Sequence, residues 1–112
     1  DKELAFNKGI RRLYIPWAFE EKQLRAFQNV LELIKNRGIS YQLIQIPVTK
    51  IRYEGYENKE FFDDYIKDQG DYYNFNSLIT LNDTLHFYDT QHLNSNGVAL
   101  FDNLLIEMLL KN

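Results

Sequence analysis

Residues 37–47 read RGISYQLIQIP, a helix end followed at once by a strand. Gly38 suits the position just past the end of a helix, where the backbone turns left-handed. The residues after it are almost continuously apolar, and Pro47 closes the run because proline has no N–H to donate to a strand ladder. We therefore predict a buried strand over 39–46.

The residues before this strand complete a βαβ unit. Residues 20–37 carry apolar side chains at helical spacing, with charged side chains on the other face. Arg11–Ile15 reads as a short strand that ends at Pro16-Trp17. Strand, helix, glycine turn and strand together predict a parallel sheet that is buried on both faces.

The remaining elements are predicted from caps and spacing. We expect a polar, Tyr-bearing loop over 48–58, and then a helix over 59–69 with Asn58 as its N-cap. The inward side of that helix would hold Phe61, Phe62, Tyr65 and Ile66. A connection over 71–76, a short strand over 78–81 and an extended piece over 85–88 would follow. The last helix, 95–110, would be capped by Asn94 or Ser95 and is so apolar that more than one side must be covered.

Composition sets limits on domain count and partners. A chain of 112 residues with 45% hydrophobic and 26% charged residues forms one globular domain at most, here 1–112. A net charge of −3 with scattered Lys and Arg excludes a nucleic-acid footprint, and no apolar run is long enough to span a membrane. The chain begins with Asp and shows no signal pattern, so we expect a processed or excised piece of a larger protein.

Asp89 and His92 are the chemically most informative pair. At a separation of three residues they can lie side by side, so that the carboxylate accepts from one ring nitrogen and leaves the other as a base. An oriented base of this kind is part of a nucleophilic hydrolase site, although an Asp–His pair that caps the last helix is the alternative. His86 extends the spacing of three, but 85–88 alternates like a strand and would scatter metal ligands. We predict no metal site.

The block Asp89-x-x-His92-Leu93-Asn94-x-x-Gly97 resembles the C-terminal block of the SGNH/GDSL hydrolases. The resemblance extends over residues 11–112, although only this block is specific. It implies a partial three-layer α/β/α (flavodoxin-like) fold with a small, mostly parallel sheet. It also implies the C-terminal portion of a serine esterase, deacetylase or acyltransferase that needs no cofactor.

In such an enzyme His92 would be the general base and Asp89 its orienting carboxylate, while Asn94 and Gly97 would be architectural: a helix cap and a close approach of the helix to the sheet. The substrate implied is an ester, for example an acylated carbohydrate. Many relatives of this type act outside the cytoplasm, so we expect an extracytoplasmic setting.

The chain departs from that family at the nucleophile. It contains no Gly-Asp-Ser block, and Pro16-Trp17 stands where an oxyanion-binding block would be expected. Three serines are present, and each reads as a cap or turn residue: Ser40, Ser77 and Ser95. The chain should therefore be inactive alone. A non-catalytic α/β module for binding or assembly is the alternative function.

Three aromatic residues are candidates for substrate binding, because ligands of open α/β sheets lie at the carboxyl ends of the strands. These are Trp17, Tyr53 and Tyr56. The alternatives are core packing for Trp17 and plain surface positions for the two tyrosines. An open sheet edge and an over-apolar final helix need covering, either by missing N-terminal sequence, which we favour, or by another chain.

Overall fold

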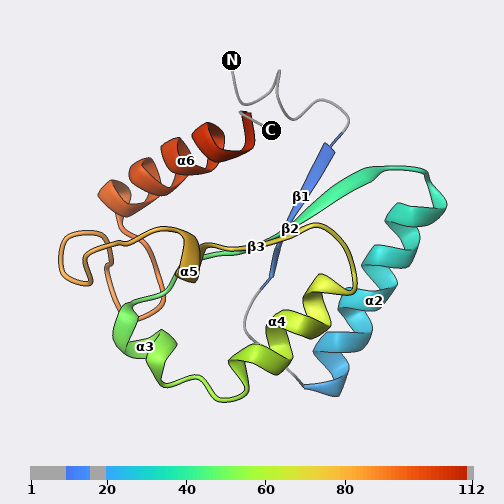
Figure 1. Ribbon diagram of the computed structural model, residues 1–112, viewed down its shortest axis with the longest axis horizontal. Helices are drawn as coiled ribbons and strands as arrows, with labels where there is room; N and C mark the ends of the chain where they lie inside the picture. The colour runs from blue at the N-terminus through green and yellow to red at the C-terminus, as the bar shows by residue number, and fades with distance from the viewer. Residues whose placement is uncertain (1–9, 16–19, 111–112) are drawn as a thin grey trace.

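A parallel sheet of three strands with helices on both faces forms the centre of the chain (Figure 1). The computed structural model describes residues 10–15 and 20–110. The elements, in chain order, are β1 (Ile10–Ile15), α2 (Glu21–Asn36), β2 (Ser40–Gln45), α3 (Lys50–Glu54), α4 (Lys59–Lys67), β3 (Tyr72–Asn74), α5 (Phe75–Leu78) and α6 (Ser95–Leu110). Residues 2–8, which read in the sequence as a short helical turn, and the expected strand end at Pro16-Trp17 lie outside the described residues.

The predicted βαβ unit is confirmed. Strands β1 and β2 pair in parallel from Ile10 opposite Ser40 to Ile15 opposite Gln45. Helix α2 ends in a Schellman motif, in which Gly38 has a φ of +65°. The N–H of Ile39 donates to the carbonyl of Ile34 at 3.2 Å, and the N–H of Gly38 donates to that of Lys35 at 3.0 Å.

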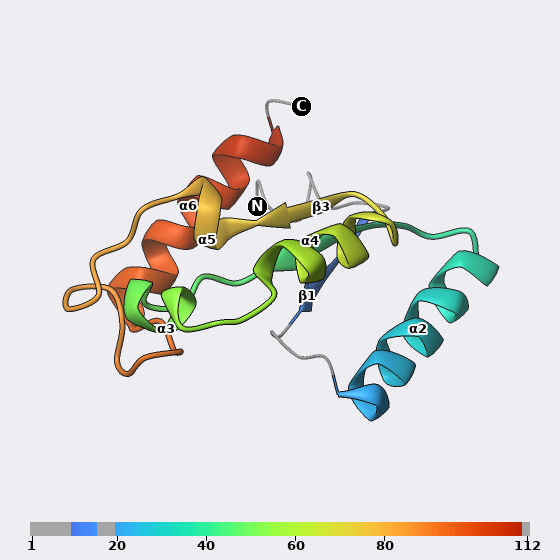
Figure 2. The same ribbon diagram turned by 60° about the horizontal axis from the view of Figure 1, so that its bottom comes forward.

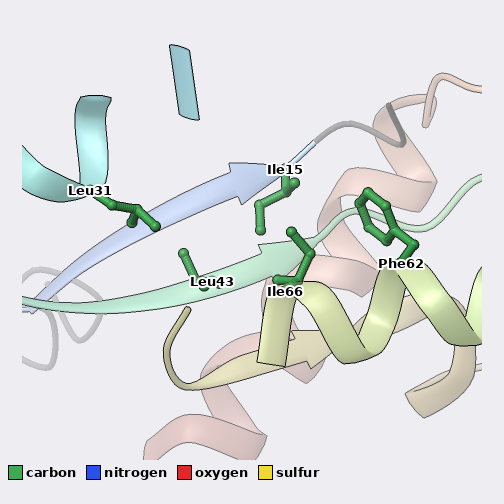
Figure 3. Close-up of a cluster of buried hydrophobic side chains, with 5 residues drawn as sticks. All are labelled: Ile15, Leu31, Leu43, Phe62 and Ile66. Carbon is green, nitrogen blue, oxygen red and sulfur yellow. The ribbon is translucent and has the colours of Figure 1, made fainter. Parts of the chain in front are cut away.

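Strand β2 is buried on both faces, as its apolar run predicts. Leu43 and Ile44 are both 0% exposed and point to opposite sides of the sheet. Leu43 packs in one core with Ile15, Leu31, Phe62 and Ile66 (Figure 3). Ile44 packs in a second core with Phe75, Phe101, Leu105 and Leu109.

These two cores define the layers. Helices α2 and α4 cover one face of the sheet, and α6 covers the other (Figure 2). Both crossovers, β1 to β2 and β2 to β3, step in the same direction across the sheet, so connections of one hand place α2 and α4 on the same face. The other face is left for α6. The mixed α/β class with a small parallel sheet is confirmed.

The segment after β2 differs from the prediction in four places. Residues 85–88, expected to be extended, form turns and bends, with only Phe87 in an isolated bridge. Residues 50–54 form α3 instead of a loop, because Thr49 caps this turn by accepting from the N–H of Arg52 at 3.3 Å. Residues 72–74 form β3, where only a connection was expected, and pair with Leu43–Gln45. The strand expected over 78–81 is absent, since 75–78 forms α5 under the Asn74 cap.

Helix α4 has the predicted position but different details. Asn58 adopts a left-handed φ of 59° and makes no side-chain cap, so its role is conformational. Phe61 is 68% exposed, which contradicts its expected inward position. Phe62 and Ile66 are four residues apart and occupy the inner face, which leaves Phe61 on the outer side.

Helix α6 matches the predicted 95–110 span, and Asn94 is its cap. The Asn94 side chain accepts from the N–H of Gly97 at 2.9 Å. Phe101, Leu105 and Leu109 are buried, whereas Leu100, Leu104, Ile106 and Met108 are only half-buried. Among the described residues, no helix has the length and apolar character that a membrane span requires.

We expect Leu43→Ala to lower the free energy of unfolding by about 2–5 kcal/mol, because it removes a fully buried side chain from the first core. Urea unfolding followed by circular dichroism measures the change. Leu33→Ala is the matched control, since Leu33 is 52% exposed on α2. Equal losses in the two variants would contradict the assigned core.

Candidate functional site

Asp89 and His92 make the contact that their spacing predicts. His92 Nδ1 lies 3.0 Å from Asp89 Oδ1 and 2.9 Å from Oδ2. Because a carboxylate only accepts hydrogen bonds, Nδ1 carries the proton and Nε2 is left as the basic nitrogen. The side chains are 60% and 57% exposed, for His92 and Asp89 respectively. The imidazole is therefore oriented and accessible.

The Asp89 carboxylate also fixes the loop in which it lies. Its Oδ1 accepts from the backbone N–H groups of Gln91 at 2.9 Å and His92 at 2.7 Å, which is an Asx-type turn. The N–H of Tyr88 donates to the carbonyl of His92 at 2.9 Å, and Phe87 forms an isolated antiparallel bridge with Leu93. The turn is thus closed across its base.

This closed turn is joined directly to α6. The N–H of Asn94 donates to the carbonyl of His86 at 3.0 Å, and its side-chain amide donates to the carbonyl of Leu85 at 2.9 Å. A Cβ at Gly97 would lie 2.0 Å from the carbonyl oxygen of His86. Gly97 therefore permits a close approach, as predicted, but to the loop at His86 and not to the sheet.

Thr49 ties the same turn to the sheet. It follows β2 and is only 5% exposed. Its N–H and its hydroxyl both donate to the carbonyl of Thr90, at 3.1 Å and 2.9 Å. Thr90 lies between Asp89 and His92, so these two hydrogen bonds hold the pair at the carboxyl end of the parallel strands.

A cleft of about 400 Å³ opens beside His92. It is bordered by the ends of β1 and β2 and by residues around α3: Tyr14, Ile15, Gln45, Ile46, Val48, Arg52, Tyr56, Gln91 and His92. Arg52 donates through Nε to the Tyr56 hydroxyl at 3.2 Å and lies over the Tyr56 ring. The cleft thus combines a base, a cation and an aromatic ring at the ligand edge of the sheet.

The pKa of Asp89 is lowered from its ordinary value of 3.8. The hydrogen bond from the Gln91 N–H is the largest cause, and the contact with His92 comes next. The carboxylate therefore stays ionised to a lower pH than an isolated aspartate. In its charged form it favours the proton on Nδ1 of His92.

The structure places the predicted wall residues differently from one another. Tyr56 lines the cleft with His92. Tyr53 does not; its hydroxyl accepts from the Asn74 amide at 3.1 Å, and Lys59 lies over its ring at 5.0 Å. Trp17 lies outside the described residues. Substrate binding by these residues stays a prediction.

His86 has a local role, as expected. Its Nδ1 accepts from the N–H of Asn82 at 2.9 Å. Within the described ranges, no group of three His, Cys, Asp or Glu side chains could hold a metal ion. None of the three serines borders the cleft: Ser40 begins β2 at the far end of that strand, Ser77 lies in α5 and Ser95 begins α6.

Among the cleft residues that the sequence did not indicate are Gln45 and Arg52. Gln45 lies within the almost continuously apolar run 39–46, and Arg52 lies within the expected loop 48–58. The pattern of Gln45 did contain the information, because a polar residue in the last position of a buried parallel strand lies at the ligand edge. Arg52 is placed by α3, whose short sequence has no helical periodicity to detect.

Neither a scan against protein-family models nor searches of curated proteins and of solved structures found a match to this chain.

The first prediction for the site concerns the Asp89 pKa, which a ¹³C NMR titration of its carboxyl carbon will place below 3.8. The pKa of Asp89 is lower in the folded state than in the unfolded state. Ionised Asp89 therefore stabilises the fold fully at pH values above the unfolded-state pKa, and this stabilisation is lost as the pH falls through the folded-state pKa. His92→Ala should raise the Asp89 pKa part of the way, since the Gln91 N–H remains. His86→Ala is the control and should leave it unchanged; a midpoint at or above 3.8 would be contradictory.

The second prediction for the site concerns the tether formed by the two hydrogen bonds from Thr49 to the Thr90 carbonyl. Thr49→Val keeps the side-chain shape but removes the hydroxyl that donates to Thr90 and caps α3. We expect a loss of about 1–2 kcal/mol in unfolding free energy and faster amide exchange at Gln91 and His92. The exposed Thr84 provides the matched Thr→Val control. Unchanged exchange at 91 and 92 would show that the tether does not order the turn.

Proposed function

We propose that this chain is the C-terminal portion of an SGNH-like serine esterase, deacetylase or acyltransferase and supplies the His–Asp part of its triad. The observation that carries the proposal is the 2.9 Å contact between His92 Nδ1 and Asp89 beside a cleft at the carboxyl edge of a parallel sheet. A base oriented by a carboxylate at this edge is what acyl transfer through a serine requires. The substrate would be an ester, such as an acylated carbohydrate.

The chemistry would follow from these positions. A serine hydroxyl from sequence outside the 112 residues would lose its proton to His92 Nε2 and attack the ester carbonyl. The protonated imidazole would return that proton to the departing alcohol, which leaves an acyl-serine. Water, or an acceptor hydroxyl, would then give a proton to Nε2 and attack the acyl carbon. Nε2 would return that proton to the serine oxygen as the acyl–serine bond breaks, which restores the serine and the neutral imidazole. Asp89 would stabilise the imidazolium in both halves of the reaction.

Three features support the presence of further protein around this chain. Strand β1 pairs only with β2 in the described part of the sheet. A largely apolar hollow of about 510 Å³ lies between β1 and α2, lined among others by Leu13, Leu24 and Phe27. The Asp89–His92 pair is more than half exposed, and a carboxylate–imidazole pair is worth more once water is excluded. Additional strands and helices beyond β1 would pair with its other edge, fill the apolar hollow and shield the Asp89–His92 pair from water.

A binding or assembly module is the second candidate. The specific observation in its favour is that none of the serines borders the cleft and the chain contains no cysteine. In that case the Asp89–His92 turn would serve only to cap α6 and to shape a ligand surface. Turnover separates the two candidates.

The experiment is fluorophosphonate labelling and 4-nitrophenyl acetate hydrolysis by the full-length protein. We expect labelling that depends on His92, and a loss in kcat of at least about 10³-fold in His92→Ala, since removing a triad base has an effect of this order. Asp89→Asn should be less active than the wild type, because the amide no longer favours the proton on Nδ1.

His86→Ala is the matched control, being a histidine of the same loop that does not border the cleft. It should retain most of the activity. An equal loss in His86→Ala, or labelling that persists in His92→Ala, would reject the assignment of His92 as base. Absence of both labelling and turnover would favour the binding module.

A further inference from the structure

Gln45 differs from Asn74, the polar residue beside it at the carboxyl edge of the sheet. In register it lies between Ile15 of β1 and Asn74 of β3. The Asn74 amide is satisfied: it donates to the Tyr53 hydroxyl and to Asp63, each at 3.1 Å, and accepts from the Asn76 N–H at 3.0 Å. The Gln45 side chain is also buried, at 3% exposed. In contrast to the Asn74 amide, however, its Oε1 has no hydrogen-bond partner among the described residues.

An unsatisfied buried amide oxygen is costly, and such groups in native proteins call for an explanation. Gln45 borders the same cleft as His92, in which a ligand of the base would lie. A second strand glutamine gives the comparison. Gln42 Oε1 is also buried without a partner in the described part of the chain, but Gln42 does not border the cleft.

We propose that Gln45 is a ligand-binding residue, whose Oε1 accepts a hydrogen bond from a free hydroxyl of the substrate. The direction follows from the chemistry of the atom, because an amide oxygen can only accept. An ester group has no donor of its own, so the donor must be another group of the same molecule. The substrate class is therefore a hydroxyl-bearing ester, such as a partially acylated carbohydrate, and not a simple acyl ester.

Other residues of the cleft suit the same class of ligand. Tyr56 is half-buried and offers an aromatic ring, and Arg52 places a guanidinium beside it. Aromatic rings pack against apolar C–H surfaces, and guanidinium N–H groups donate to hydroxyl oxygens. The identification of the molecule as an ester rests on the proposed function, whereas the hydroxyl contact to Gln45 does not.

The test compares Gln45→Met with wild type in the full-length protein, on a monoacetylated methyl glucoside and on 4-nitrophenyl acetate. Methionine keeps the length of the side chain and removes the acceptor. We expect kcat/KM for the glucoside ester to fall about tenfold, the factor that one hydrogen bond of ordinary strength supplies, while that for 4-nitrophenyl acetate stays within about twofold. The melting temperature should not fall, because the substitution removes an unsatisfied buried oxygen.

Gln42→Met is the matched control and should leave both substrates unaffected. Gln45→Asn, which keeps the amide but withdraws it by one methylene, should also weaken turnover of the glucoside ester and offers a second variant if methionine impairs folding. Equal effects of Gln45→Met on the two esters, or no effect on either, would overturn the proposal while the proposed function still stands on His92→Ala.

If the protein hydrolyses neither ester, the proposed function fails and the inference is judged by binding. Methyl glucoside is then titrated into ¹⁵N-labelled protein, with the amide shifts of Gln91 and His92 as the readout. Saturable shifts with a Kd that rises about tenfold in Gln45→Met, but not in Gln42→Met, support the hydroxyl contact. No saturable shift, or an equal Kd in both variants, overturns it.

Discussion

Strand β2 is buried on both of its faces, and this burial sets where the helices of the chain must lie. Leu43 and Ile44 are adjacent, point to opposite sides of the sheet and are both fully buried. Each face of the sheet must therefore be covered by helices. Helices α2 and α4 cover the face of Leu43, and α6 covers the face of Ile44. Since α6 must lie on the face opposite to the crossover helices, the chain has to pass around the carboxyl end of the sheet to reach it. The Asp89–His92 turn lies on that path.

The position of the turn combines two kinds of interaction. Its internal shape is local: one carboxylate oxygen accepts two backbone N–H groups and both oxygens contact the imidazole. Its location is not local, because the carbonyl of Thr90 is held by Thr49, which lies 41 residues earlier in the chain. A turn with the same internal hydrogen bonds but without Thr49 would still orient the imidazole, but not toward the strand ends.

This division explains how much could be predicted from the sequence. The α2 helix, the β2 strand, α6 and the Asp89–His92 contact all follow from periodicity, a glycine and a spacing of three, which are properties of neighbouring residues. Strand β3 was missed because Tyr72–Asn74 is too short and polar to read as a strand, and exists by pairing with Leu43–Gln45. Gln45 and Arg52 became site residues only once the sheet edge and α3 were known. For Phe61 the error is a residue wrongly assigned to the core. It is apolar, but it lies on the outer side of α4 and is exposed.

Gly97 gives the turn and α6 a common frame. Its missing side chain lets the first turn of the helix lie against the carbonyl of His86, while Asn94 holds the helix start and the loop together. The imidazole is thereby coupled mechanically to the helix axis. A shift of α6 along the sheet would therefore also move Nε2 of His92. A partner that packed on the half-buried side of α6 and shifted it would change the position of this basic nitrogen.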